Sequence, residues 1–171
     1  SWHLDEGSGT TAYDTSGKNN NGTLINGPTW VDGKFGKALS FDGVNDWLDT
    51  PDNMLTIPGS ISLWFKTTMT GDGVIYGMAN ANVGGTVSWH VPVLYINNGT
   101  LKGEYGWYGS FDTINVSGVN DGAWHHVVLG HDGTNDFMYF DGNLVTSRAQ
   151  TAQLNVYQQI GVGYRSSGWG T

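Results

Sequence analysis

The sequence predicts an all-β protein, a sandwich of two antiparallel sheets, and three observations support this fold class. Short runs that alternate apolar and polar residues recur along the chain, which is the period of a strand with one buried face. The 27 glycines fall at the turns between these runs rather than in tracts. No stretch shows the period of about 3.6 residues that marks an amphipathic helix. A length of 171 residues fits one domain, 1–171, with a single core.

The strands are predicted in chain order from this alternation. They lie at 2–4, 23–25, 29–31, 60–67, 74–78, 86–96, 100–106, 113–116 and 157–162. The runs 38–41 and 46–49 are interpreted as one strand that is interrupted at Asp42-Gly43-Val44-Asn45. Between Pro51 and Pro58 we expect a loop that holds one helical turn.

A central meander is predicted between Ala123 and Val145. Adjacent residues in the run 124–129 point to opposite faces of the pleat. The run 137–140 is aromatic at three of its four positions, and aromatic residues favour strands. Asp141-Gly142 is a hairpin signal, because both central residues of a type I′ turn need a positive φ. The pattern therefore predicts consecutive antiparallel strands here.

Three segments resemble the landmarks of one family. Trp124-His125-His126-Val127, followed by the run 139–145, is similar to the "WHHV … Y-x-DG-x-L-V" signature of laminin-G-like domains. The segment 4–17 resembles the family's opening, and Gly36 to Gly43 resembles its second landmark. These domains belong to the concanavalin A-like lectin/glucanase superfamily, so the resemblance implies a jelly-roll sandwich. It implies little about function, because this fold hosts many functions.

The resemblance also raises an expectation about the C-terminal part of the fold. In the family, a segment like 157–164 is followed by a loop and a last strand of the form "G-x-I-D-x-V-R-I-Y". Here the sequence stops at Gly168-Trp169-Gly170-Thr171, where that strand should begin. A missing last strand would expose a sheet edge. We therefore expect the domain 1–171 to be part of a longer protein from which it has been excised.

Composition and charge exclude several classes of partner. The net charge is −8, from 15 acidic and 7 basic residues, and nucleic-acid or anionic-membrane binding needs clustered Lys and Arg. Cysteine is absent, so no disulfide contributes to stability. No apolar run is long enough to predict a membrane span, so we expect no membrane insertion. The family and the loops rich in Asn, Thr and Gly favour an extracellular or cell-surface protein.

The resemblance implies a structural calcium site. Calcium takes oxygen ligands from carboxylates, amides and carbonyls on irregular loops. Asp14, Asn19, Asp42 and Gly43 lie at positions that resemble the family's calcium site, so the sequence predicts calcium there. The alternative is that both aspartates form Asx turns that cap their own loops.

A sugar site is predicted at the densest group of aromatic residues, in the segment 104–111. Sugars present apolar faces that stack on aromatic rings, and hydroxyls that need polar partners. The predicted ligand-binding residues are Glu104, Tyr105, Trp107 and Tyr108, in a loop where glycines would leave the rings exposed. Weaker candidates are Trp89, His90 and Trp169. The alternative is core packing, the usual role of Trp in a sandwich, which we expect for Trp64 and Trp124.

Neither a zinc site nor a catalytic site is predicted. His125 and His126 point to opposite faces of a strand, and His131 lies too far along it, so pleat packing is the better interpretation. Glycosidases of the superfamily use closely spaced carboxylates, and retaining chemistry needs two of them about 5 Å apart. The only glutamates are Glu6 and Glu104, far apart in sequence. The domain is therefore expected not to be an enzyme.

The sequence favours a non-catalytic carbohydrate-binding or adhesion module of a larger extracellular protein, with a glycan or polysaccharide as partner. The alternative is a structural or protein-interaction domain of a surface layer, fibre or virion without a sugar site. The two hypotheses differ in whether Tyr105, Trp107 and Tyr108 are exposed beside polar groups.

Overall fold

The computed structural model describes residues 1–79, 90–105, 113–150, 154 and 157–161, and every regular element within these ranges is a strand. The fold class predicted from the sequence is confirmed. The helical turn expected between Pro51 and Pro58 is wrong, since that loop contains only turns and bends. Pro58 disfavours the α region for the residue before it, which acts against a helical turn there.

Most strand boundaries follow the alternating runs, but the strand predicted at 2–4 is wrong, because Trp2 makes only an isolated bridge to Asp14. In chain order the strands are β1 Thr11–Ala12, β2 Gly22–Ile25, β3 Thr29–Asp32, β4 Lys37–Ser40, β5 Trp47–Asp49, β6 Gly59–Lys66, β7 Asp72–Ala79, β8 His90–Asn97, β9 Thr100–Gly103, β10 Ile114–Ser117, β11 Trp124–His131, β12 Asn135–Phe140, β13 Asn143–Ala149 and β14 Tyr157–Gly161.

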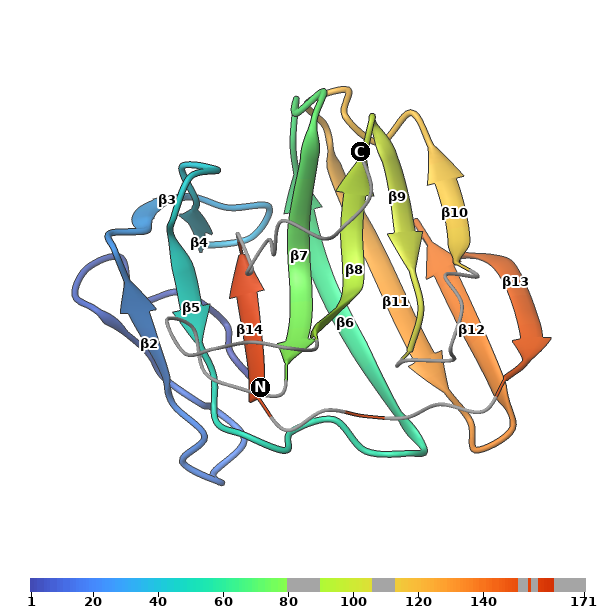
Figure 1. Cartoon of the computed structure of the whole chain (residues 1–171). Coiled ribbons are helices and arrows are strands. Elements are labelled where there is room, and N and C mark those ends of the chain that lie inside the picture. Colours follow the sequence, from blue (N-terminus) through green and yellow to red (C-terminus); the bar gives the residue numbers. More distant parts are fainter. Residues whose placement is uncertain (80–89, 106–112, 151–153, 155–156, 162–171) are drawn as a thin grey trace.

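Among the described residues the strands form two large antiparallel sheets and one hairpin. The eight-stranded sheet has the order β1-β2-β5-β14-β7-β8-β9-β10, and the four-stranded sheet has the order β13-β12-β11-β6. β3 and β4 form a separate two-stranded hairpin. Figure 1 views the molecule from the eight-stranded sheet, with the four-stranded sheet behind it. The two sheets pack face to face and enclose the main core.

The predicted meander is confirmed in detail. β11 pairs antiparallel with β12 on one side and with β6 on the other, so that His126 lies opposite Trp64. The turn between β12 and β13 has positive φ at both Asp141 (47°) and Gly142 (81°), as a type I′ turn requires. The register therefore fixes which side chains of β6, β11 and β12 share a face.

The core has two parts, and both match the inward positions of the strands. The main cluster of buried residues lies between the two large sheets and comprises Phe65, Tyr76, Met78, Val93, Leu94, Ile96, Leu101, Tyr105, Ile114, Val119, Val127, Leu129 and Met138. A smaller cluster of Ala12, Leu24 and Leu48 packs against residues of the β3–β4 hairpin and the N-terminal segment. The hairpin thus covers the part of the eight-stranded sheet that the four-stranded sheet does not reach.

One predicted strand is wrong as a single element. The runs 38–41 and 46–49 belong to different sheets, because β4 pairs with β3 while β5 pairs with β2 and β14. The loop between them turns at Gly43, whose φ is 76°. Only glycine adopts this conformation without strain, so the loop redirects the chain from one layer to the other.

Candidate functional site

The outer face of the four-stranded sheet carries exposed aromatic side chains. On β6, Leu63 and Phe65 point into the core, so Ser62, Trp64 and Lys66 point outward by alternation. Trp64 is 40% exposed, whereas Phe65 is 9% exposed. The expectation that Trp64 packs in the core is therefore wrong, because Trp64 lies on the same outward side of β6 as Ser62 and Lys66. This alternation is visible in the sequence and could have identified the site.

Trp64 is surrounded by four side chains from three segments of the chain. The His126 ring lies 5.1 Å from the Trp64 ring, centroid to centroid, and Phe35 meets it edge-on at 5.7 Å. Nζ of Lys34 lies 5.3 Å from the Trp64 ring centroid. Oγ of Ser62 and Nε2 of His126 are hydrogen-bonded at 3.0 Å. We call these five residues, Lys34, Phe35, Ser62, Trp64 and His126, the Trp64 cluster.

The exposed apolar surface continues from the Trp64 cluster across β11 and β12. The Tyr139 ring is 40% exposed and meets Phe137 edge-on at 6.1 Å. Tyr139 pairs with Val128, which pairs with Ser62, so a row of outward side chains runs across three strands. Trp124, which was expected in the core, is half-buried and shares the outward parity of His126. The face is broad, apolar and aromatic, with hydroxyl and imidazole groups among the rings.

At one end of β11, His125 points to the opposite side of the strand from His126 and makes a charged hydrogen-bond group. Nδ1 of His125 lies 2.8 Å from a carboxylate oxygen of Asp141, and its Nε2 lies 3.2 Å from Asp121. Partial burial lowers the pKa of His125, but the hydrogen bonds to Asp141 and Asp121 outweigh it and raise the pKa above its usual value. Asp141 also accepts a hydrogen bond from the backbone N–H of His126 at 2.8 Å, which ties the β12–β13 turn to β11.

Part of the predicted sugar site is buried. Glu104 and Tyr105 are both 0% exposed, so the prediction that Tyr105 presents its ring to solvent is wrong. Tyr105 packs in the main core, and its hydroxyl donates to the carbonyl oxygen of Thr56 at 3.0 Å. Burial raises the pKa of Tyr105 to about 12. Trp107 and Tyr108 lie outside the described residues, so their role in sugar binding stays a prediction. Trp89 and Trp169 lie outside them too, and for His90 only the backbone is described.

The first predicted calcium ligands form a hydrogen-bonded turn. The Asp14 carboxylate accepts hydrogen bonds from the backbone nitrogen of Ser1, from the N–H and hydroxyl of Ser16 and from the N–H of Asn20. Asn19 adopts a left-handed conformation with a φ of 57° in the same loop. Both oxygens of Asp14 are therefore engaged by the turn itself.

The second pair of predicted ligands also lies in a capped turn. Oδ1 of Asp42 accepts the N–H groups of Val44 at 2.7 Å and Asn45 at 3.2 Å, and these bonds lower the pKa of Asp42. Gly43 provides the positive φ between them. Within the described ranges no three His, Asp or Glu side chains are grouped in a way that could hold a metal. The described carboxylates thus do not form a preformed cation site, and calcium stays a prediction.

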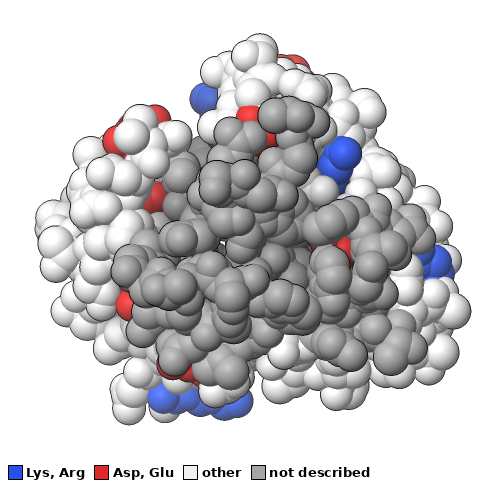
Figure 2. All heavy atoms as spheres, in the orientation of Figure 1, with Lys and Arg blue, Asp and Glu red and all other residues white. Residues whose placement is uncertain are grey.

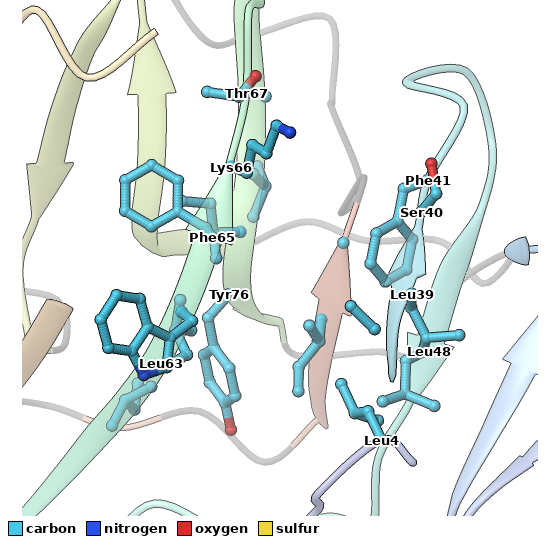
Figure 3. Close-up of a pocket in the computed structure, with 18 of the residues that line it drawn as sticks. Leu4, Leu39, Ser40, Phe41, Leu48, Leu63, Phe65, Lys66, Thr67 and Tyr76 are labelled. Carbon is cyan, nitrogen blue, oxygen red and sulfur yellow. The ribbon is translucent and has the colours of Figure 1, made fainter. Parts of the chain in front are cut away.

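A cavity with a volume of about 830 Å³ lies between β6 and the β3–β4 hairpin. In Figure 3, Leu63 and Phe65 approach it from one side, and Leu39, Phe41 and Leu48 approach it from the other. The lining also includes Ser62, Trp64 and Lys66, so this cavity adjoins the Trp64 cluster.

The two outer faces of the sandwich differ in where their described Lys and Arg side chains lie. Figure 2 shows the eight-stranded side, where the Lys and Arg side chains of the described part lie apart from one another around the margin. On the four-stranded side, Lys34 and Lys66 are both associated with Trp64, one over its ring and one two residues along the same strand. The described part of the chain contains strands and no helix, so it has no helix that is long and apolar enough to cross a membrane.

The fold and the outer face define a β-sandwich of the lectin-like class, and sequence comparison identifies the family. Residues 42–170 match the profile of the Laminin_G_3 family, described as the concanavalin A-like lectin/glucanases superfamily. This match covers more than half of the chain, so the chain belongs to that family. The resemblance found in the sequence is thereby confirmed. A comparison with curated proteins gives no significant match.

Three solved structures are similar to this chain, and the first of them supports the same fold. Domain 4 of AbnA, a GH43 extracellular arabinanase from Geobacillus stearothermophilus in complex with arabinotriose, is similar with a TM-score of 0.58 and 21% identity, over 88% of this chain and 78% of that chain. Domains LG4-5 of the mouse laminin alpha1 chain align with a TM-score of 0.48 and 20% identity, over 73% and 35%. The carbohydrate-binding module CBM66 from Bacillus subtilis aligns with a TM-score of 0.42 and 17% identity, over 82% and 86%. At these identities the likeness concerns the fold alone.

Proposed function

We propose that this chain is a non-catalytic carbohydrate-binding or adhesion module of a larger extracellular protein, and that its sugar site is the Trp64 cluster. The observation that carries the proposal is the exposed aromatic group at the outer face of β6, with Trp64 40% and Phe35 71% exposed. Trp64 lies on a strand paired within a sheet, so its ring needs little reorganisation to receive a ligand and little conformational entropy is lost on binding.

The chemistry of the Trp64 cluster suits a sugar better than a purely apolar partner. A sugar ring stacks its C–H face on an aromatic ring and directs its hydroxyls to polar atoms at the margin. The hydroxyl of Ser62 and the imidazole of His126 lie beside Trp64 and offer such partners. Amphipathic aromatic surfaces of this kind are typical of recognition sites, since one part is apolar and the other can hydrogen-bond.

The absence of catalysis is part of the proposal. Ser62 and His126 form a hydrogen bond on an open sheet face, but a nucleophile also needs a group that orients the base and donors for an oxyanion. The side chains of Asp121 and Asp141 bind the ring of His125 rather than that of His126. The similar domain of AbnA is described in complex with arabinotriose, and AbnA is described as extracellular, which supports a glycan as the first ligand class to test.

A glycan array that includes arabino-oligosaccharides, followed by calorimetric titration, tests this function. We expect a dissociation constant in the micromolar to millimolar range, about −4 to −8 kcal/mol. Trp64→Ala or Phe35→Ala should weaken binding about tenfold or more, which corresponds to about 1.4 kcal/mol. Tyr13→Ala is the matched control, because Tyr13 is also an exposed aromatic residue but lies next to β1.

The same titration separates the Trp64 cluster from the loop predicted by sequence. If Trp107→Ala and Tyr108→Ala abolish binding while Trp64→Ala and Phe35→Ala bind like the wild type, the sugar site lies in the segment 106–112. If the array detects no glycan, the carbohydrate hypothesis fails. The structural or protein-interaction domain then becomes the better description.

A further inference from the structure

We propose that the Trp64 cluster and Lys66 select acidic glycans, that is, sugars that carry carboxylate or sulfate groups. This inference rests on the proposed function, because it names the ligand class of the same site. Two lysines, Lys34 and Lys66, flank the exposed Trp64 in a protein with a net charge of −8.

Among the residues that the structure describes, neither lysine has an ion-pair partner. The salt bridge between Lys37 and Asp32, at 2.7 Å, shows how a lysine of the β3–β4 hairpin is neutralised within the protein. In the described part of the chain, Lys34 and Lys66 have no carboxylate within 4.0 Å. Their ammonium groups therefore remain available to a negatively charged ligand.

The positions of the two lysines match a ligand that lies on Trp64. Nζ of Lys34 lies over the Trp64 ring, 5.3 Å from its centroid. Lys66 is two residues from Trp64 on β6, and its side chain leaves the sheet on the same face, about 7 Å along the strand. A sugar stacked on Trp64 or Phe35 would thus place its substituents between two cations.

A charged substituent gains more from these lysines than a hydroxyl does. Hydrogen bonds between an ammonium group and an anionic oxygen are shorter and about twice as strong as those between neutral groups. Lys34 is long and exposed, so it can leave the Trp64 ring for an anionic group without moving the sheet. When an acidic sugar binds, Lys34 therefore exchanges a weak cation–π contact for a stronger hydrogen bond to the anionic group. The sugar ring also stacks on the exposed aromatic ring.

The acidic residues near the cluster define where the negative charge of a ligand can lie. Asp121 and Asp141 lie at the end of β11 beside His125, and both carboxylates are hydrogen-bonded to that ring. They disfavour an anion next to His125. The acidic groups of the ligand are therefore expected over β6 and the β3–β4 hairpin, beside Lys34 and Lys66.

Matched pairs of probes test this selectivity. One pair is oligogalacturonate and its methyl ester, and the other is dextran sulfate and dextran, so that one pair tests carboxylate and the other tests sulfate. The acidic member of at least one pair should bind about tenfold or more tightly than its neutral partner in 0.1 M NaCl. Its affinity should fall in 1 M NaCl, where the Debye length shrinks from about 10 Å to about 3 Å.

Charge-removing variants locate the selectivity. Lys34→Gln and Lys66→Gln should each weaken binding of the acidic probe about two- to fivefold, as expected for exposed ion pairs. The control is Lys18→Gln, which removes the same charge from the exposed loop between β1 and β2 and should change nothing.

The inference is overturned if neutral glycans bind as tightly as acidic ones, or if Lys34→Gln and Lys66→Gln behave like Lys18→Gln. In that case the sugar-binding function itself still stands, provided that Trp64→Ala loses binding. If no glycan of either kind binds, the proposed function and this inference both fail.

Discussion

Replacing Gln158 by Met should destabilise the sandwich through one buried acceptor. Gln158 lies on β14, is 2% exposed, and its Oε1 accepts three hydrogen bonds. The donors are the hydroxyl of Tyr76 at 2.8 Å and the N–H groups of Met54 at 3.2 Å and Leu55 at 3.1 Å. β14 pairs with both β5 and β7, so this side chain connects the two halves of the eight-stranded sheet with the loop before β6.

The expected magnitude follows from the burial of the three donors. Gln158→Met keeps the length of the side chain but removes the acceptor. The Tyr76 side chain is almost fully buried, which raises its pKa and keeps the hydroxyl a donor, so leaving that hydroxyl without Gln158 costs about 1–3 kcal/mol. The two N–H groups belong to a partly exposed loop and can turn to water at lower cost. A total of about 3 kcal/mol, or a melting temperature lower by about 6–12 °C, is expected.

A double-mutant cycle in urea tests the reasoning. Tyr76→Phe removes one donor and should cost only about 0.5–1.5 kcal/mol, because Gln158 keeps its other partners. The double variant should be less destabilised than the sum of the single variants by about 1 kcal/mol or more, since no hydroxyl is then left without its acceptor. Additivity within about 0.5 kcal/mol would refute the explanation by a shared buried hydrogen bond.

Two further predictions concern pH and calcium. Because the pKa of His125 is raised in the folded state, its pairing with Asp141 contributes fully to stability below about pH 6.5, and this contribution is lost as the pH rises through the raised pKa. His125→Gln should therefore destabilise the protein by about 0.2–1 kcal/mol more at pH 6 than at pH 9. Equal losses at both pH values would contradict this. If the loops of Asp14 and Asp42 bind calcium, CaCl₂ at 100 times the dissociation constant should stabilise the folded state by about 2.7 kcal/mol. The melting temperature should then be about 5–10 °C higher in CaCl₂ than in EDTA. Asp14→Asn should reduce that difference, and equal melting of the wild type in both buffers would remove the calcium site.

Local sequence signals were sufficient for most of the fold. The turn at Asp141-Gly142 and the alternation along 124–129 indicate the strands and their antiparallel pairing, whereas the register shift between Met138 and Tyr139 has no signal in the turn type or the alternation. The single strand predicted from 38–41 and 46–49 was wrong for a non-local reason. Its two halves are individually correct strands, but which sheet each joins depends on partners far away in the chain.

The site could be predicted only in part, because it combines local parity with distant contacts. The outward direction of Trp64 follows from its neighbours Ser62 and Lys66, and the general preference of Trp for the core was the weaker argument. The approach of Phe35 and Lys34 could not be read from the sequence, since the hairpin that carries them is not paired with β6. The burial of Tyr105 likewise depends on Thr56, in a loop about fifty residues away.

β6 serves stability with one face and ligand binding with the other, so the two properties should separate by residue parity. Ile61, Leu63 and Phe65 pack against the main core, and shortening them should lower stability by about 2–5 kcal/mol, as for other core truncations. Trp64 and Lys66 point outward, so changing them should alter glycan binding and leave the urea midpoint almost unchanged. Leu63→Ala and Trp64→Ala are the sharpest pair, because they are adjacent on one strand. A large loss of stability in Trp64→Ala would show that its ring holds the β3–β4 hairpin against the sheet, and its loss of binding would then no longer identify a sugar contact.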